Sequence, residues 1–359
     1  SLNDQGELEE GAFYVWKKPE LENIITTRFD LFADYYNINR VGLWEHGNYH
    51  LIRSSSDETF ASKHNIKLSE FQKMVEQWRA QLLKERSKKP RPRLDDKILT
   101  SWNALMLKGY IDAYRVFDDV HFLDIALKNA AFLEQNLLKE DGSLHRNFKD
   151  KKATINAYLE DYAALIEAYI SLYEVTFDEK WLQLSKQLTD VTFDHFYHTE
   201  SNMFYFTSDQ DAALITRKTE VEDNVIPASN SIMAKNLLKL GHFYENKYYI
   251  KVSQQMVHNI APLIENYASA YSNWLDVYSN FSSNFYEVAI LGNNAFQKMK
   301  ALNKVYIPNK IIAGNIGESN LPLLQNRFID GETMLYVCVN NTCNYPTPNS
   351  EIALEQMRK

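Results

Sequence analysis

The chain has 359 residues, 45% of them hydrophobic and 13% aromatic, so it can build one large domain or two ordinary ones, and disorder of the whole is excluded. Its formal net charge of −8 comes without a long basic block, so we expect no nucleic acid partner. No run approaches the roughly 18 apolar residues that span a bilayer, so we expect no membrane association and a cytoplasmic protein.

Residues that break helices are scarce. The sequence holds 11 glycines and 9 prolines, about 3% and 2.5% of the chain, against averages of roughly 7% and 5%. So few turn-forming residues argue against an all-β fold and favour long helices.

The first hundred residues predict two helices joined by a long connection. We expect helices near 19–36, where Pro19 suits the first turn, and 69–87, where Ser69–Gln72 has the pattern of a capping box. The connection contains Trp44, Glu45 and His46, an aromatic, a carboxylate and an imidazole that together could supply acid, base and stacking surface. The alternative is a loop that is simply anchored by Trp44.

The middle of the chain reads as a repeat of helical pairs. The first helix of each pair is apolar nearly all round, which predicts burial on most sides. The second helix is apolar on one side only, so its polar face should meet water. The second helices begin with the similar segments 122–126, 181–185 and 249–253, spaced by 59 and 68 residues. A repeat of this length, with buried first helices and with second helices that are solvent-exposed on one side, predicts a closed α/α toroid. Its inner helices are expected near 98–117, 159–175 and 232–244.

The connections between pairs are long, near 139–157 and 198–227, and should lie at one end of the ring together with the first turns of the inner helices. Those first turns are polar, with Asp95 and Asp96, Glu160 and Asp161, and Ser229 and Asn230. Each set alone is explained by helix capping, but three on one rim favour a site.

After about residue 284 the pattern changes to that of a small α/β subdomain. We expect strands at 286–291 and 334–339, a weaker one at 310–313, and helices near 295–302 and 350–357. Cys338 and Cys343 flank a probable turn, so their sulfurs can approach if the strand folds back. A structural role is favoured over a redox pair, and two cysteines do not make a zinc site, so we expect no metal.

The sequence contains the stretches Glu9–Trp16, Trp44–Gly47, Arg91–Asn103, Leu159–Tyr162 and Pro227–Ser231. Together they resemble the YyaL or spermatogenesis-associated protein 20 family. That resemblance implies a thioredoxin-like N-terminal domain, expected to be absent from this chain, followed by an α/α toroid similar to N-acylglucosamine 2-epimerases and six-hairpin glycosidases. We therefore expect a mainly α protein with a toroid over 1–283 and a C-terminal α/β subdomain over 284–359. The chain departs from the family pattern at Arg93, where the family often has His, and at Ala228–Asn230, where it often has Ser-Gly-Asn.

The leading hypothesis is a carbohydrate site at the rim, of glycoside hydrolase or sugar epimerase type and without a cofactor. Paired carboxylates in unequal environments can act as acid and base, and the candidates are Asp96, Asp161 and Asp223. An epimerase ranks lower because neither His46 nor His50 lies on an inner helix. Sugar contacts are expected from Trp44, Glu45, His46, Asp95, Trp102, Asn103, Glu160, Tyr162, Ser229 and Asn230.

The alternative is a binding module without chemistry of its own, which serves the thioredoxin-like domain of a full-length protein. It predicts an aromatic-lined cavity without a close carboxylate pair. An enzyme of the glycosidase class predicts two carboxylates roughly 5 to 9.5 Å apart in that cavity.

Overall fold

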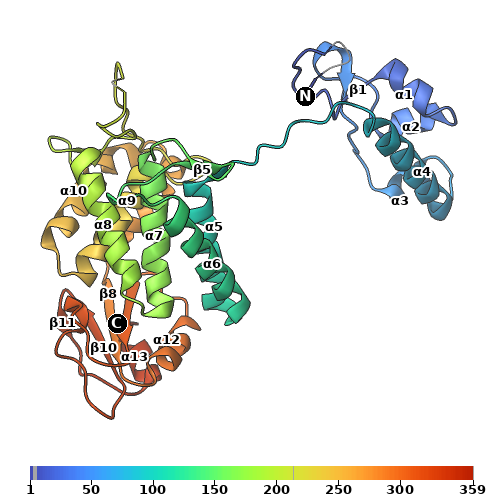
Figure 1. The fold of residues 1–359 in the computed structure, drawn as a ribbon. Helices are drawn as coiled ribbons and strands as arrows, with labels where there is room; N and C mark the ends of the chain where they lie inside the picture. Colours follow the sequence, from blue (N-terminus) through green and yellow to red (C-terminus); the bar gives the residue numbers. More distant parts are fainter. Residues whose placement is uncertain (3–5, 213, 359) are drawn as a thin grey trace. The chain divides into compact units, whose positions relative to one another are not determined.

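The computed structural model describes residues 1–2, 6–212 and 214–358 and divides the chain into two compact units. The N-terminal unit is Ser1–Asp96 and the C-terminal unit is Lys97–Lys359. Each is described separately below, and Figure 1 labels their elements.

The N-terminal unit is a small helical body around an aromatic core. Phe32, Tyr35, Phe71 and Trp78 are buried there, with their rings in edge-on or tilted contact. Its elements are β1 (Trp16–Lys17), α1 (Lys18–Ile24), α2 (Phe29–Tyr35), η1 (Glu45–Gly47), β2 (Asn48–Tyr49), α3 (Asp57–Lys63) and α4 (Leu68–Arg86), with β1 antiparallel to β2.

Two expectations for this unit are wrong in detail. The single helix near 19–36 is instead two helices, because Arg28 takes the left-handed conformation with φ 56° and β-branched Thr26 and Thr27 precede it. The capping box at Ser69 does not form, since Lys67 is the N-cap and its carbonyl already accepts the N–H groups of Glu70 and Phe71. Helix α3 lies in the connection that the sequence pattern left without structure.

The C-terminal unit contains the three expected helical hairpins. Each turn between the paired helices includes a residue with positive φ, namely Asp118, Phe177 and Glu245, which ends the first helix sharply. The pairs are α5 (Thr100–Phe117) with α6 (Val120–Asn136), α7 (Leu159–Thr176) with α8 (Lys180–His195), and α9 (Ser229–Phe243) with α10 (Lys247–Ile264). A further helix, α11 (Ser272–Ser282), was not expected.

Helix α7 is the centre of the hairpin array. It packs against α5, α8 and α9, so the first helices of the pairs stand together on the inside and the second helices lie outside. This is the arrangement of an α/α toroid, and the expected mainly α fold is confirmed. Nearly every residue of α7 is buried, as expected, but α5 is one-sided: Trp102 and Met106 are 66% and 58% exposed.

A four-stranded sheet covers the end of the helices opposite to the long connections (Figure 1). Its order is β11-β10-β8-β9, with β9 parallel to β8 and the other neighbours antiparallel. The expected strands and helices are confirmed as β8 (Tyr286–Leu291), α12 (Ala295–Asn303), β9 (Lys310–Asn315), β10 (Met334–Val339), β11 (Thr342–Cys343) and α13 (Ser350–Gln356). The boundary between 283 and 284 stays a prediction.

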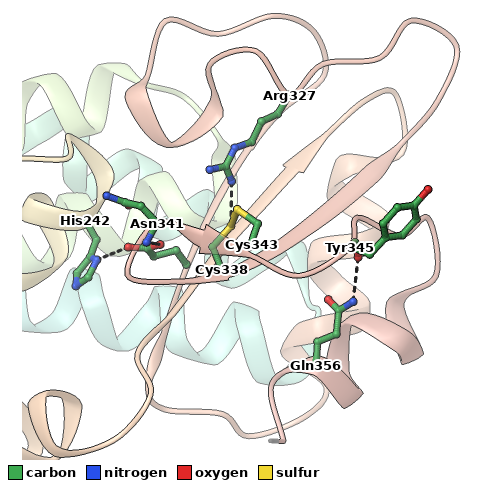
Figure 2. The surroundings of a disulfide bond; sticks show 8 residues. His242, Arg327, Cys338, Asn341, Cys343, Tyr345 and Gln356 are labelled. Atoms are coloured by element: carbon green, nitrogen blue, oxygen red, sulfur yellow. Dashed lines mark hydrogen bonds and ion pairs between the residues drawn. A yellow bond between two sulfur atoms is a disulfide. The ribbon is translucent and has the colours of Figure 1, made fainter.

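The strand does fold back at the two cysteines. Cys338 on β10 and Cys343 on β11 are directly opposite each other and form a disulfide. Figure 2 shows the Arg327 guanidinium donating to Cys338 Sγ at 3.3 Å. At the turn of the same hairpin, the Asn341 N–H donates to Glu287, whose other carboxylate oxygen lies 2.6 Å from His242 Nδ1 on α9. The bonded cysteines thus close a hairpin that is tied to an inner helix.

Among the described residues no helix is long and apolar enough to cross a membrane.

Candidate functional site

The first turns of the inner helices and the long connections lie at the same end of the C-terminal unit (Figure 1). The connections are folded back as short strands, and the first of them pairs with the residues that precede α5. These strands are β3 (Ile98–Leu99), β4 (Asn147–Lys149), β5 (Lys152–Ala153), β6 (Tyr197–His198) and β7 (Met203–Phe204). We call this end the rim.

Asp161 joins two inner helices at the rim. Its side chain is fully buried, and its carboxylate accepts the N–H of Ser101 at 2.9 Å and that of Tyr158 at 3.0 Å. Arg146, from the connection, makes an ion pair with it at 3.0 Å. Burial raises the pKa of the Asp161 carboxyl, against the opposing effect of the Arg146 charge. The first turns of α5 and α7 are therefore held together by one carboxylate.

Arg146 also pairs with Glu160, and its guanidinium lies 4.7 Å from the centre of the Tyr158 ring. Two carboxylates thus share one cation, which positions both. Tyr162 is buried in the next turn, and its hydroxyl oxygen accepts the N–H of Leu144 at 2.9 Å. Burial raises the pKa of Tyr162 to about 12, so this phenol stays protonated near neutral pH.

The start of α9 is fixed by carboxylates from the preceding connection. Asp223 accepts the N–H of Ala228 at 2.8 Å and the hydroxyl of Ser231 at 2.9 Å with one oxygen, and the N–H of Asn273 at 2.8 Å with the other. Glu220 accepts the N–H of Ser229 at 3.0 Å. These are the donors that the first turn of a helix leaves without intrahelical partners.

Asn230 and Ser229 are both buried. The Asn230 side chain accepts from the N–H of Phe204 and donates to the carbonyls of Phe204 and Glu220, each at 2.9 Å. The Asn230 side chain therefore links the backbone at Phe204 to the backbone at Glu220 within the connection. The Ser229 hydroxyl is buried with no hydrogen-bond partner among the described residues.

A cavity of about 860 Å³ opens at the rim beside these carboxylates. It is open enough for a small organic ligand. Tyr267, 67% exposed, supplies an aromatic side chain, and the Tyr271 hydroxyl lies 3.5 Å from the Glu222 carboxylate. The residues around this rim cavity are Phe206, Lys218–Asn224, Tyr267, Ser269 and Ala270.

The rim cavity is connected to α7 through Phe206. The Phe206 carbonyl accepts the N–H of Leu159 at 2.9 Å, and its ring lies 5.1 Å from that of Tyr158. The segment from Phe204 to Phe206 is therefore hydrogen-bonded to the first turns of α9 and α7, and Asp161 links α7 to α5.

The remaining candidates on α5 differ in exposure. Trp102 presents most of its ring to solvent, as a stacking residue would. Asn103 is half-buried, and its side-chain amide donates to the carbonyl of Leu99, four residues earlier in the chain, at 2.8 Å.

Five candidates lie in the N-terminal unit. Trp44 is half-buried, with its ring centre 4.8 Å from that of His50, and a side-chain carbon at Gly11 would approach it to 3.0 Å. Glu45 and His46 are exposed in η1, and Asp95 and Asp96 are exposed in the extended segment at the end of the unit. No site role of any candidate is tested by these contacts, and those roles stay predictions.

Sequence reasoning missed the carboxylates that line the rim cavity beside Asp223. Glu220 and Glu222 stand in the run Glu220-Val221-Glu222-Asp223, a few residues before the first turn of α9. That cluster of three acids in four positions was a usable signal. Among the described residues, no group of three or more histidine, cysteine, aspartate or glutamate side chains is placed to hold a metal ion.

Comparison with known proteins agrees with the fold. A family model described as "Beta-L-arabinofuranosidase, GH127 catalytic domain" matches residues 69–263, more than half of the chain. The resemblance to spermatogenesis-associated protein 20 is confirmed: the human protein is 25% identical over 382 residues, covering 94% of this chain and 48% of that protein. An uncharacterised Caenorhabditis elegans protein is 28% identical over 270 residues, covering 68% of this chain and 37% of that protein. The chain spans about half the length, or less, of these curated relatives.

The solved structures that match part of the chain include an alpha-mannanase and an epimerase. A GH76 alpha-mannanase of Bacteroides thetaiotaomicron has a TM-score of 0.43 at 12% identity, covering 79% of this chain and 70% of that one. The cellobiose 2-epimerase of Spirochaeta thermophila has a TM-score of 0.38 at 11% identity, covering 46% and 43%.

Proposed function

Because the chain belongs to the family described as beta-L-arabinofuranosidase, GH127 catalytic domain, we propose that it is a carbohydrate-processing protein that binds and hydrolyses a glycoside in the rim cavity. The observation that carries the proposal is the acidic run along that cavity, which places Glu220, Glu222 and Asp223 beside a space of about 860 Å³. Carboxylates hydrogen-bond sugar hydroxyls, and an aromatic ring such as that of Tyr267 covers a sugar face.

The three carboxylates have different surroundings, which suggests different roles. Asp223 is fixed by three donors on its two oxygens, so it is an oriented carboxylate at the edge of the cavity. Glu222 is exposed and has the Tyr271 hydroxyl 3.5 Å away, so its carboxyl group is the one that a ligand in the cavity can reach. Glu220 fixes the first turn of α9 and holds the run in place.

Hydrolysis then follows the chemistry of carboxylate pairs. Glu222 gives a proton to the departing glycosidic oxygen as the bond from that oxygen to the anomeric carbon breaks. Asp223 stabilises the positive charge that develops on the sugar ring, and one water molecule supplies the hydroxyl of the released sugar and returns the proton to Glu222. The substrate class that we propose first is an arabinofuranoside, after the family description.

Asp161 has a supporting part in this proposal. Its carboxylate is fully buried, and three donors surround it, so it positions the first turns of α5 and α7 beneath the cavity. Asp96, which belongs to the N-terminal unit, stays a proposed catalytic carboxylate. A thioredoxin-like domain in a full-length protein remains a proposed partner in the same chain.

The test is hydrolysis of 4-nitrophenyl α- and β-L-arabinofuranosides, with the matching xyloside, glucoside and mannoside as comparison substrates. Glu222→Gln keeps the shape and removes the proton, so kcat should fall by about 10² to 10⁴ while KM changes little. Glu265→Gln, an exposed residue outside the rim cavity, is the matched control and should leave both constants unchanged.

Two results would decide against hydrolysis. Undiminished turnover in Glu222→Gln would remove Glu222 from the mechanism. A sugar that raises the thermal midpoint of the wild type but is never cleaved would favour the binding module.

A further inference from the structure

A second polar region lies at the other end of the inner helices, away from the rim. Arg115 lies in the last turn of α5, Glu174 in the last turn of α7, and Lys239 in the second half of α9. The Arg115 guanidinium donates to Glu174 at 2.8 Å, and the Lys239 ammonium lies 3.7 Å from the same carboxylate. Three inner helices therefore turn charged side chains toward one another on the inside of the array.

A cavity of about 570 Å³ opens beside these charges. We call it the lumen cavity. Strand β9 and the segment before it form its other wall, which contributes Lys304, Tyr306 and Lys310. The Glu174 carboxylate joins the two walls, since it also accepts the N–H of Ile312 at 3.2 Å.

Glu174 already has more positive charge around it than it can balance. Its side chain is almost fully buried, and although burial acts to raise its pKa, Lys239 and Arg115 hold that pKa below the usual value. Arg115 also lies 3.4 Å from one oxygen of Asp112, whose other oxygen pairs with the Lys108 ammonium at 2.6 Å. Arg115 is therefore shared by two carboxylates, while Lys239 has Glu174 as its ion-pair partner.

Lys310 adds a third cation. Its ammonium donates to the Ile307 carbonyl at 2.9 Å, and no carboxylate of the described chain lies within 4 Å of it. Burial, together with the charges of Arg115 and Lys239, lowers the pKa of Lys310 to about 8 against the attraction of Glu174. With Arg115, Lys239, Lys304 and Lys310 protonated, the lining of the lumen cavity carries four positive charges against the two carboxylates of Asp112 and Glu174, an excess of two.

We propose that the lumen cavity is a second ligand site, which binds a phosphate-class oxyanion among Arg115, Lys239 and Lys310. A phosphate dianion matches the excess charge, and its oxygens accept from a guanidinium and from ammonium groups in short, charge-assisted hydrogen bonds. The cavity is larger than a bare phosphate needs, so a phosphate monoester of a small molecule fits as well as inorganic phosphate. This site is separate from the rim cavity and does not depend on the hydrolysis proposed there.

The test is isothermal titration calorimetry on the whole 359-residue chain at pH 7 and constant ionic strength, with inorganic phosphate, glucose 6-phosphate and sodium chloride as titrants. We expect saturable binding of one phosphate compound per chain and none of chloride. Lys310→Met and Lys239→Met should each raise Kd at least tenfold. Lys251→Met, which removes an exposed lysine of α10, should leave Kd unchanged.

Circular dichroism of each variant shows whether it has folded. If one of the two lysine variants does not fold, the other still tests the proposal. Tighter binding of glucose 6-phosphate than of inorganic phosphate identifies a monoester as the ligand, and equal binding identifies the free ion. Chloride-like heats for both compounds, or an unchanged Kd in both folded lysine variants, would overturn the proposal.

Discussion

The carboxylate of Asp161 on α7 accepts the backbone N–H of Ser101 on α5 at 2.9 Å. The bond spans 60 residues of sequence and lies in the buried interior of the rim. It fixes the relative height of two inner helices at the end where the ligand is proposed to bind. A side chain that donates at this place would face the Ser101 N–H and the Arg146 guanidinium, which are themselves donors.

Asp161→Asn should lower the free energy of unfolding by about 3 kcal/mol, because it leaves Arg146 short of a carboxylate and places amide hydrogens near backbone donors. Glu160→Gln is the matched control, since Glu160 pairs with the same arginine but is partly exposed, and its cost should be about 1 kcal/mol. Urea denaturation measures both. A loss in Asp161→Asn no greater than that in Glu160→Gln would contradict the buried role.

The two helical glycines on α5 and α9 should respond oppositely to alanine. A side-chain carbon at Gly109 meets nothing within 4 Å, so Gly109→Ala should stabilise the protein by about 0.5 to 1 kcal/mol. At Gly241 the same carbon would approach Ile250 Cγ1 to 2.5 Å, so Gly241→Ala should destabilise by about 1 to 3 kcal/mol. Thermal unfolding of the pair is the measurement, and midpoint shifts of the same sign would refute the packing of α9 on α10.

Lys310 should make stability depend on pH in the alkaline range. Its pKa is lowered to about 8 in the folded chain, against about 10.4 when unfolded, so between these values the unfolded state binds more protons. Stability therefore rises with pH through this window, by at most about 3 kcal/mol. Because other groups also titrate here, the quantity to follow is the difference between wild type and Lys310→Met, in urea series from pH 7 to 10.5.

At pH 7 the Lys310→Met variant should be the more stable protein, and its advantage should shrink as pH rises. A difference that stays constant across the window would show that Lys310 is not held in a disfavoured charged form.

The disulfide should contribute modestly, because Cys338 and Cys343 are only 5 residues apart. Closing so short a loop in the unfolded chain corresponds to about 2 kcal/mol in the chain-entropy treatment. Dithiothreitol should therefore lower the urea midpoint of the wild type, while the double variant with alanine at both positions should show no response to it. Equal midpoints for the wild type with and without reductant would argue that the bond does not stabilise the fold.

The repeat was the part of the fold that local sequence predicted best. The aromatic-aliphatic segments at Phe122, Trp181 and Tyr249 begin one or two residues inside α6, α8 and α10. Short turns and helices that are apolar on one side produce a recognisable local sequence pattern. The break at Arg28 was missed because no local sequence pattern marks an arginine in the left-handed conformation. The exposed face of α5, which carries Trp102 and Met106, was missed because hydrophobicity alone does not say which neighbours a helix will have.

The sequence indicated where the candidate site lies, but not which contacts its residues make. The acidic and polar first turns pointed to the rim, yet their hydrogen bonds show that Asp223 and Asn230 also hold the backbone in place. The lumen cavity was missed altogether. Arg115, Glu174 and Lys239 belong to three helices, and only tertiary packing brings them together.

The bond from the Ile312 N–H to Glu174 joins residues 138 positions apart. During synthesis, α7 therefore emerges long before the strand that completes the surroundings of its buried carboxylate. Contacts at such separation are slow to form, and a chain that lacks them exposes unfinished surfaces. We infer that the helical hairpins assemble first and that docking of β9 is a late step in folding, so a chain cut before residue 310 would keep the ion pairs of Glu174 with Arg115 and Lys239 but lack its hydrogen bond from Ile312.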